Sequence, residues 1–276
     1  MRAMFRHSII PVILIFTFQD AICAELHEIK PPNIIPTWAD IQRGEILLDG
    51  EIQQGDFNKI IVYLKARPEL PSGFSIRSAG GDIIESRLIG EFFRETLLSI
   101  YVMEYCYSAC FYILSASTNR IVPDSALIGV HTPQYYRENF TGLSREEAAK
   151  KYLQLRSSSE NYFKQRGVPE NIIEKMFSVP FEDMYFLNIQ EKQVLNTEPH
   201  ALNEWLRAKC NPLTAGEYAD LNRKNFIGRN LKPEEPPMGI SAEYWSYLMQ
   251  KNDYATDCLA KIRKDKLTAL LTKYDQ

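Results

Sequence analysis

The sequence predicts an α/β fold in which helices cover a mostly parallel sheet. Between residues 45 and 131, short apolar runs typical of strands alternate with amphipathic segments typical of helices. This alternation favours parallel strands joined by helical crossovers. From residue 198 onward only helical patterns continue, so we expect a helical appendage at the C-terminus.

The predicted strands are runs rich in β-branched and aromatic residues, bounded by Gly, Pro or Asp. We expect them within residues 45–52, 73–78, 98–103, 120–122, 126–130 and 184–187. The predicted helices show apolar residues at spacings of three and four, or follow capping signals. We expect them at residues 57–65, 82–97, 107–117, 144–166, 169–177, 189–195 and 242–274.

The composition is that of an ordinary globular protein, with 45% hydrophobic and 24% charged residues and a net charge of −3. Acidic and basic residues are mixed along the chain, so no basic face is expected and nucleic acid is excluded as a partner. A chain of 276 residues can bury a sufficient core without a metal. We expect neither a metal nor a cofactor.

The N-terminus has the pattern of a secretory signal peptide over residues 1–24. Arg2 and Arg6 precede a short apolar run, and small residues suited to cleavage lead to Ala24. The run is too short to span a bilayer, which takes about 20 residues, although a short membrane anchor is the alternative. We therefore expect a periplasmic or secreted protein, with residues 25–43 as a Pro-rich arm.

The cysteines are expected to form disulfides. If Cys23 leaves with the signal peptide, Cys106, Cys110, Cys210 and Cys258 remain, and an even number is typical of an exported protein with disulfides. Cys106 and Cys110 would lie within disulfide range on a helix, and Cys210 with Cys258 is the other natural pair. The sequence alone does not fix the pairing. Cys/His spacings typical of zinc sites do not occur.

Short motifs after the predicted strands carry groups suited to acyl transfer. Gly80 and Gly81 allow a tight turn whose N–H groups suit a developing oxyanion, although a plain turn is the alternative. Ser108 stands where a strand meets a helix, where an N-cap serine is the alternative. His131 ends the apolar run 126–130, where a structural histidine is the alternative.

The order of these motifs resembles the ClpP family of serine peptidases, within the crotonase-like fold. The residues that carry the resemblance are Ile76-Arg77-Ser78-Ala79-Gly80-Gly81, Cys106-Tyr107-Ser108-Ala109 and Val130-His131-Thr132-Pro133. The resemblance covers about residues 44–195. It implies a βαβ superhelical domain over residues 44–197, followed by the helical appendage over residues 198–276.

The resemblance also implies the roles of site residues. Ser108 would be the nucleophile and His131 the general base that activates it. The backbone N–H groups of Gly81 and Ala109 would form the oxyanion hole.

An acidic residue completes the implied site, and the chain departs from the family around it. Asp183 matches the place of the acid that holds the imidazole, with Glu182 as the alternative. Ala79, Cys106 and Thr132 replace the proline, glycine and glutamine of the family motifs. These departures indicate a divergent branch.

The function predicted from these residues is that of an exported serine hydrolase acting on a peptide or protein substrate. A catalytically inactive ClpP-like protein that binds or assembles is the alternative. A thiol-redox role for Cys106 and Cys110 is a third reading, although their spacing is not the usual redox motif. The resemblance implies a homo-oligomer that pairs subunits through helix 144–166, and outside the cytoplasm no ATPase partner is expected.

Overall fold

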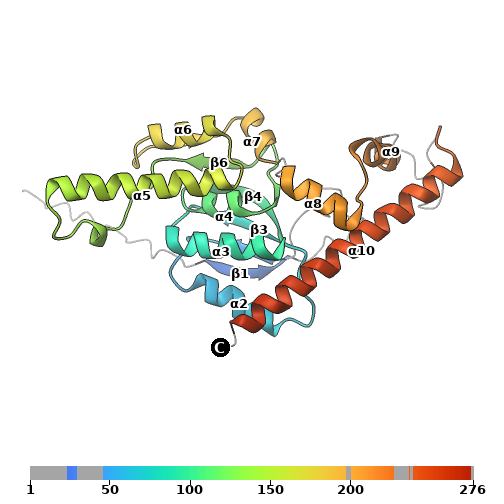
Figure 1. Cartoon of the computed structure of the whole chain (residues 1–276), viewed down its shortest axis with the longest axis horizontal. Helices are drawn as coiled ribbons and strands as arrows, with labels where there is room; N and C mark the ends of the chain where they lie inside the picture. Colours follow the sequence, from blue (N-terminus) through green and yellow to red (C-terminus); the bar gives the residue numbers. More distant parts are fainter. Residues whose placement is uncertain (1–23, 30–45, 197–199, 227–235, 237–238, 275–276) are drawn as a thin grey trace, which may run out of the picture.

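The computed structural model describes residues 24–29, 46–196, 200–226, 236 and 239–274, and it shows a mixed α/β domain from which a long C-terminal helix projects (Figure 1). The predicted α/β class is confirmed. The predicted signal peptide, apart from its last residue, and most of the predicted arm lie outside the described residues.

The described part of the chain forms a seven-stranded sheet with the order β1-β2-β3-β4-β6-β7, in which β5 pairs with β4 off this path. The strands are β1 (Glu25–Glu28), β2 (Ile46–Asp49), β3 (Gly73–Ser78), β4 (Ser99–Tyr107), β5 (Asn119–Ile121), β6 (Leu127–Val130) and β7 (Tyr185–Phe186). Strands β2 to β6 pair in parallel, and the edge strands β1 and β7 pair antiparallel. The sequence did not predict β1, because most of its side chains are exposed and show no alternation.

The helices follow the predicted order. They are α2 (Asp56–Ala66), α3 (Ile83–Thr96), α4 (Cys110–Ala116), the 3-10 turn η1 (Arg137–Asn139), α5 (Arg145–Gln165), α6 (Glu170–Ser178), α7 (Ile189–Leu195), α8 (His200–Cys210), α9 (Ala215–Phe226) and α10 (Ala242–Lys273). Side chains cap some of them, with Asp82 accepting from Glu85 N at α3 and a capping box of Ser144 and Glu147 at α5.

Helix α4 lies at the centre of the core, and all of its residues are buried. It is shorter than predicted because β4 continues through Tyr107. The first part of β4 pairs with β5, and its last part, Tyr105 to Tyr107, pairs with β6. The strand thus carries the chain to the edge of the sheet where α4 begins.

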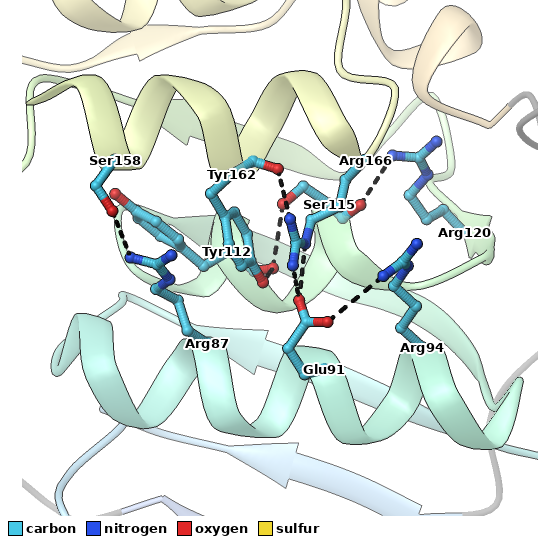
Figure 2. A network of polar contacts seen from close by, with 9 residues as sticks. All are labelled: Arg87, Glu91, Arg94, Tyr112, Ser115, Arg120, Ser158, Tyr162 and Arg166. Carbon is cyan, nitrogen blue, oxygen red and sulfur yellow. Dashed lines mark hydrogen bonds and ion pairs between the residues drawn. The ribbon is translucent and has the colours of Figure 1, made fainter.

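A polar network joins α3, α4 and α5 on one side of the sheet (Figure 2). The Arg166 Nε donates to the Glu91 carboxylate at 2.8 Å, and the Arg166 guanidinium lies 3.5 Å from the centre of the Tyr162 ring. The Tyr162 hydroxyl donates to the Tyr112 carbonyl oxygen at 3.0 Å. The end of α5 is therefore fixed to both helices beneath it.

The last turns of α10 belong to the core of the domain. Leu267 and Leu271 are buried in the main hydrophobic cluster, and the Arg263 Nε donates to the Leu97 carbonyl oxygen at 2.8 Å. The opposite end of α10 extends away from the sheet toward α9 (Figure 1). Among the described residues, no helix is both long and apolar enough to cross a membrane.

Candidate active site

The parallel strands bring the predicted site residues to one edge of the sheet. The Gly80-Gly81 turn follows β3, Ser108 follows β4, and His131 follows β6. These strands are neighbours, since β4 pairs in parallel with both β3 and β6. The carboxyl ends of adjacent parallel strands open onto a common edge, where ligands bind in α/β proteins.

Ser108 occupies a strained turn between β4 and α4. Its φ of 53° lies in the left-handed region that residues with a β-carbon rarely adopt. The turn is held by a hydrogen bond from Ser108 N to the Gly129 carbonyl oxygen at 2.9 Å. A serine on such a sharp strand-to-helix turn presents its Oγ at the edge of the sheet.

The N-cap alternative for Ser108 does not hold. The residue at the N-cap of α4 is Ala109, and no side chain caps this helix. In the described part of the chain, the Ser108 Oγ has no hydrogen-bond partner, and Ser108 is only half-buried. Its hydroxyl is thus left accessible and is not used to cap the helix.

The glycine turn packs directly against the Ser108 turn. Gly80 and Gly81 have φ values of 107° and 129°. A β-carbon at Gly80 would lie 2.8 Å from the Ser108 Cβ and 2.9 Å from the Ala109 N. A β-carbon at Gly81 would lie 2.1 Å from the Ile52 carbonyl oxygen. Both positions therefore require glycine, for the backbone angle and for the close approach.

The two amides assigned to the oxyanion hole have no competing acceptor. Gly80 O accepts from Ile52 N at 2.7 Å, and Asp82 N donates to Ile52 O at 2.8 Å, so the hydrogen bonds of this turn flank Gly81. Within the described residues, neither Gly81 N nor Ala109 N donates a hydrogen bond. Free amides of this kind can stabilise negative charge on a bound carbonyl oxygen.

His131 is buried, with 6% of its surface exposed, and its ring packs edge-on against Phe181 at a centroid distance of 5.1 Å. The Nδ1 lies 3.0 Å from the Thr132 carbonyl oxygen. Because a carbonyl oxygen only accepts, Nδ1 carries the proton in this hydrogen bond, and Nε2 of the neutral ring is an acceptor. Burial lowers the pKa of His131, so the ring is neutral near pH 7.

Ser108 and His131 line the same cleft, which has a volume of about 1060 Å³. Gly81 also lines the cleft, as does Tyr136 in the loop after His131. The Tyr136 hydroxyl donates to Asp82, the N-cap residue of α3, and so links this loop to the glycine turn.

The predicted acid lies apart from this group. Asp183 and Glu182 are exposed, in the turn before β7, and neither lines the cleft, although Phe181 and Met184 on either side of them do. In the residues that the structure describes, neither carboxylate hydrogen-bonds to His131. The His131 Nδ1 pairs with the Thr132 carbonyl oxygen and not with a carboxylate. Sequence reasoning missed this partner because a backbone carbonyl has no sequence signature.

The cysteines form two disulfides, Cys106–Cys110 and Cys210–Cys258. The expected disulfides are present, but Cys106 and Cys110 do not share a helix. Cys106 lies in β4 and Cys110 begins α4, with a Cα–Cα distance of 5.3 Å across the turn that holds Ser108. Groups of three or more His, Cys, Asp or Glu side chains arranged as metal ligands do not occur in the described part of the chain.

Comparisons with known proteins add a likeness of fold. A scan against models of protein families finds no match, and a search of curated proteins finds none either. Among solved structures, the chain is similar to a ClpP1 mutant from Listeria monocytogenes, with 17% sequence identity and a TM-score of 0.41 over 56% of this chain and 91% of that chain.

Proposed function

We propose that the chain is a serine hydrolase that cleaves peptide bonds. The observation that carries the proposal is that Ser108 and His131 line one cleft, with unbonded amides at Gly81 and Ala109 in the same pair of turns. Nucleophile, base and oxyanion donors are the parts that acyl transfer needs.

The proposed reaction proceeds in two steps. The His131 Nε2 accepts the proton of the Ser108 Oγ as the oxygen attacks the substrate carbonyl carbon, and the amides of Gly81 and Ala109 stabilise the oxyanion. Collapse of this intermediate breaks the C–N bond, His131 protonates the leaving amine, and an acyl-serine remains. Water, deprotonated by His131, then attacks the acyl carbon, the C–O bond to the Ser108 Oγ breaks, and His131 returns the proton to Oγ as the acid leaves.

The histidine is suited to this role without a carboxylate in contact. The Thr132 carbonyl oxygen fixes the tautomer, leaving Nε2 free to accept a proton. We propose that Asp183, or Glu182 beside it, contributes to catalysis without contacting His131, since both carboxylates are exposed and the His131 Nδ1 already pairs with the Thr132 carbonyl oxygen. Replacing Asp183 by Asn should therefore lower activity less than ten-fold, whereas loss of a contacting triad acid costs about 10⁴-fold.

The test of the proposal is labelling with a fluorophosphonate, which reacts with activated serines. We expect one adduct, on Ser108 by mass spectrometry of peptides, and none in Ser108→Ala. The matched control is Ser115→Ala, since Ser115 is buried in α4, and labelling should persist there. Peptide and ester substrates of graded length then distinguish peptidase from esterase. Absence of both labelling and turnover would support the inactive, binding alternative.

We also propose that the protein is exported and acts as a homo-oligomer. Two disulfides fit an oxidising compartment. On α5, Leu153 is 62% exposed, which fits a helix that contacts a second copy. Mass spectrometry of the protein from the periplasm or medium should show a new N-terminus near Ala24, and light scattering should give a mass above 31.9 kDa. An uncleaved N-terminus would contradict export, and a monomer would contradict assembly.

A further inference from the structure

A disulfide closes the turn that carries Ser108. Cys106 is the next-to-last residue of β4 and Cys110 is the first of α4, so the bridge spans Tyr107, Ser108 and Ala109. Both cysteines are fully buried. The bond therefore lies beneath the candidate nucleophile and not at the surface.

Both ends of this bridge are held in place by the fold. Cys106 pairs with Ser78 of β3 on one side and with Ile128 of β6 on the other. Cys110 opens a helix that is buried along its whole length. The disulfide thus joins fixed points on the sheet and on the central helix, and it leaves the residues between them little freedom.

Ser108, which lies between the two cysteines, has a backbone conformation that needs such a restraint. Ser108 has a φ of 53°, and a left-handed conformation in a residue with a β-carbon persists only where its surroundings over-determine it. The Ser108 turn is held by Ser108 N donating to Gly129 O at 2.9 Å and by Phe111 N donating to Ser108 O at 3.0 Å. The Cys106–Cys110 bond adds a covalent restraint to these hydrogen bonds.

We propose that the Cys106–Cys110 disulfide is a positioning element for acyl transfer, which sets the Ser108 Oγ and the Ala109 N–H in their reactive places. This inference rests on the function proposed above. Relaxation of the turn would displace the nucleophile and one oxyanion donor together, and a misplacement of about 1 Å can cost 10²-fold in rate. We therefore expect its loss to lower the rate of acylation and to leave substrate binding nearly unchanged.

The second disulfide of the chain supplies the matched control. Cys210–Cys258 joins α8 to α10 and closes a sequence separation of 48, whereas Cys106–Cys110 closes a separation of 4. A disulfide that closes a longer loop restrains the unfolded chain more strongly. The control bond should therefore matter more for the melting temperature and less for the reactivity of Ser108.

The experiment compares wild type with Cys106→Ala/Cys110→Ala and with Cys210→Ala/Cys258→Ala in the full chain. We expect the first double variant to lower fluorophosphonate labelling and kcat at least ten-fold, with KM for an ester within about three-fold. The second should keep kcat and labelling within about two-fold while its melting temperature falls further. Equal kcat and labelling in wild type and the first variant would overturn the inference.

Reduction gives the same test without altering the side chains. In the Cys210→Ala/Cys258→Ala protein, a dithiol reduces only the bond beside Ser108, and alkylation with mass spectrometry verifies its state. Labelling should fall on reduction and return on reoxidation, even if the alanine variant fails to fold. Unchanged labelling after verified reduction would overturn the inference. An unlabelled wild type would instead overturn the proposed function and this inference with it.

Discussion

At the level of single residues, the site depends on backbone conformation as much as on side chains. Ser108 and both glycines of the adjoining turn have positive φ, and they meet where β3 and β4 end. Gly80 is the glycine that packs against the nucleophile turn, since any β-carbon there would collide with Ser108 and the amide of Ala109. The glycine turn and the nucleophile turn therefore form one packed unit.

Gly80→Ala should disrupt that unit. Alanine at this position would have to adopt a φ of 107°, and its β-carbon would lie 2.8 Å from the Ser108 Cβ. We therefore expect fluorophosphonate labelling of Ser108 to fall at least ten-fold. The strain should also lower the free energy of unfolding by about 1–3 kcal/mol. Gly142→Ala is the control, because Gly142 has a φ of 80° but no atom within 4 Å of a β-carbon. Gly142→Ala should lower the free energy of unfolding in urea yet keep full labelling of Ser108. Equal losses of labelling in Gly80→Ala and Gly142→Ala would contradict the packing argument.

The pH profile of acylation should report His131. Only the neutral ring accepts the serine proton, so the rate falls as pH drops through the pKa of His131. Burial lowers this pKa from the ordinary value of 6.5, and the midpoint should therefore lie below 6.5. Fluorophosphonate labelling rates between about pH 4 and 8 measure the midpoint, with circular dichroism as the check on folding. A midpoint above 6.5 would contradict a buried, neutral base.

Residue patterns predicted part of this site. That Ser108 and His131 share a sheet edge follows from their places after parallel strands, which short-range patterns reveal. The left-handed φ of Ser108 was not predictable, because it depends on contacts with residues distant in sequence. The partner of the His131 Nδ1 was not predictable either, because it is a backbone carbonyl oxygen, which no residue type signals. The role of Asp183 stays a prediction.

At the level of elements, α3, α4 and α5 are joined through polar side chains over the buried helix (Figure 2). Arg166 is the central cation of this network, and only 9% of its side chain is exposed. Its Nε donates to the Glu91 carboxylate, and its Nη1 donates to the Tyr162 carbonyl oxygen. The α5 end therefore stays attached to α3 while the rest of α5 projects.

Glu91→Gln should weaken this attachment. It removes a charged acceptor from the mostly buried Arg166, and we expect the free energy of unfolding to fall by about 1–3 kcal/mol. Arg94→Gln is the control, because Arg94 also faces Glu91, at 3.6 Å, but is 48% exposed. Exposed ion pairs contribute about 0–1 kcal/mol, so this control should change little in urea denaturation. Equal effects of the two substitutions would contradict the account.

The element pattern was predicted well where periodicity is strong and poorly where it is weak. Helix α3 and helix α5 lie where amphipathic spacing and capping signals place them. The predicted strand ends at Met103, but pairing with β6 extends β4 to Tyr107, and this pairing leaves no signal in the local sequence. Strand β1 owes its place to pairing with β2, which its own sequence does not signal.

At the level of the whole molecule, the C-terminal segment is part of the fold and not only an appendage. The end of α10 packs against α3, and its C-cap residue Tyr274 contacts Phe57 of α2. Leu267 and Leu271 of α10 complete the core that begins in the N-terminal half. The predicted boundary at residue 197 follows from the point at which strands stop alternating with helices along the sequence. Local periodicity carries no signal for a later helix such as α10 that returns to the same core.

Leu267→Ala should destabilise the whole domain. Leu267 is 1% exposed, and truncating a buried leucine costs about 2–5 kcal/mol through lost burial and the cavity left behind. The control is Val62→Ala on α2, which is 67% exposed and should change stability by less than about 0.5 kcal/mol. A single cooperative transition, shifted only in Leu267→Ala, is expected in urea. A separate transition for the helical segment would contradict a shared core.

The most direct test of the central claim is the rate of fluorophosphonate labelling at Ser108 in wild type and in His131→Gln. If the two residues act as nucleophile and base in one cleft, wild type should carry the label on Ser108, and the variant should react at least 10³-fold more slowly. A wild type with no label on Ser108, or a variant that labels as fast as wild type, would contradict the account.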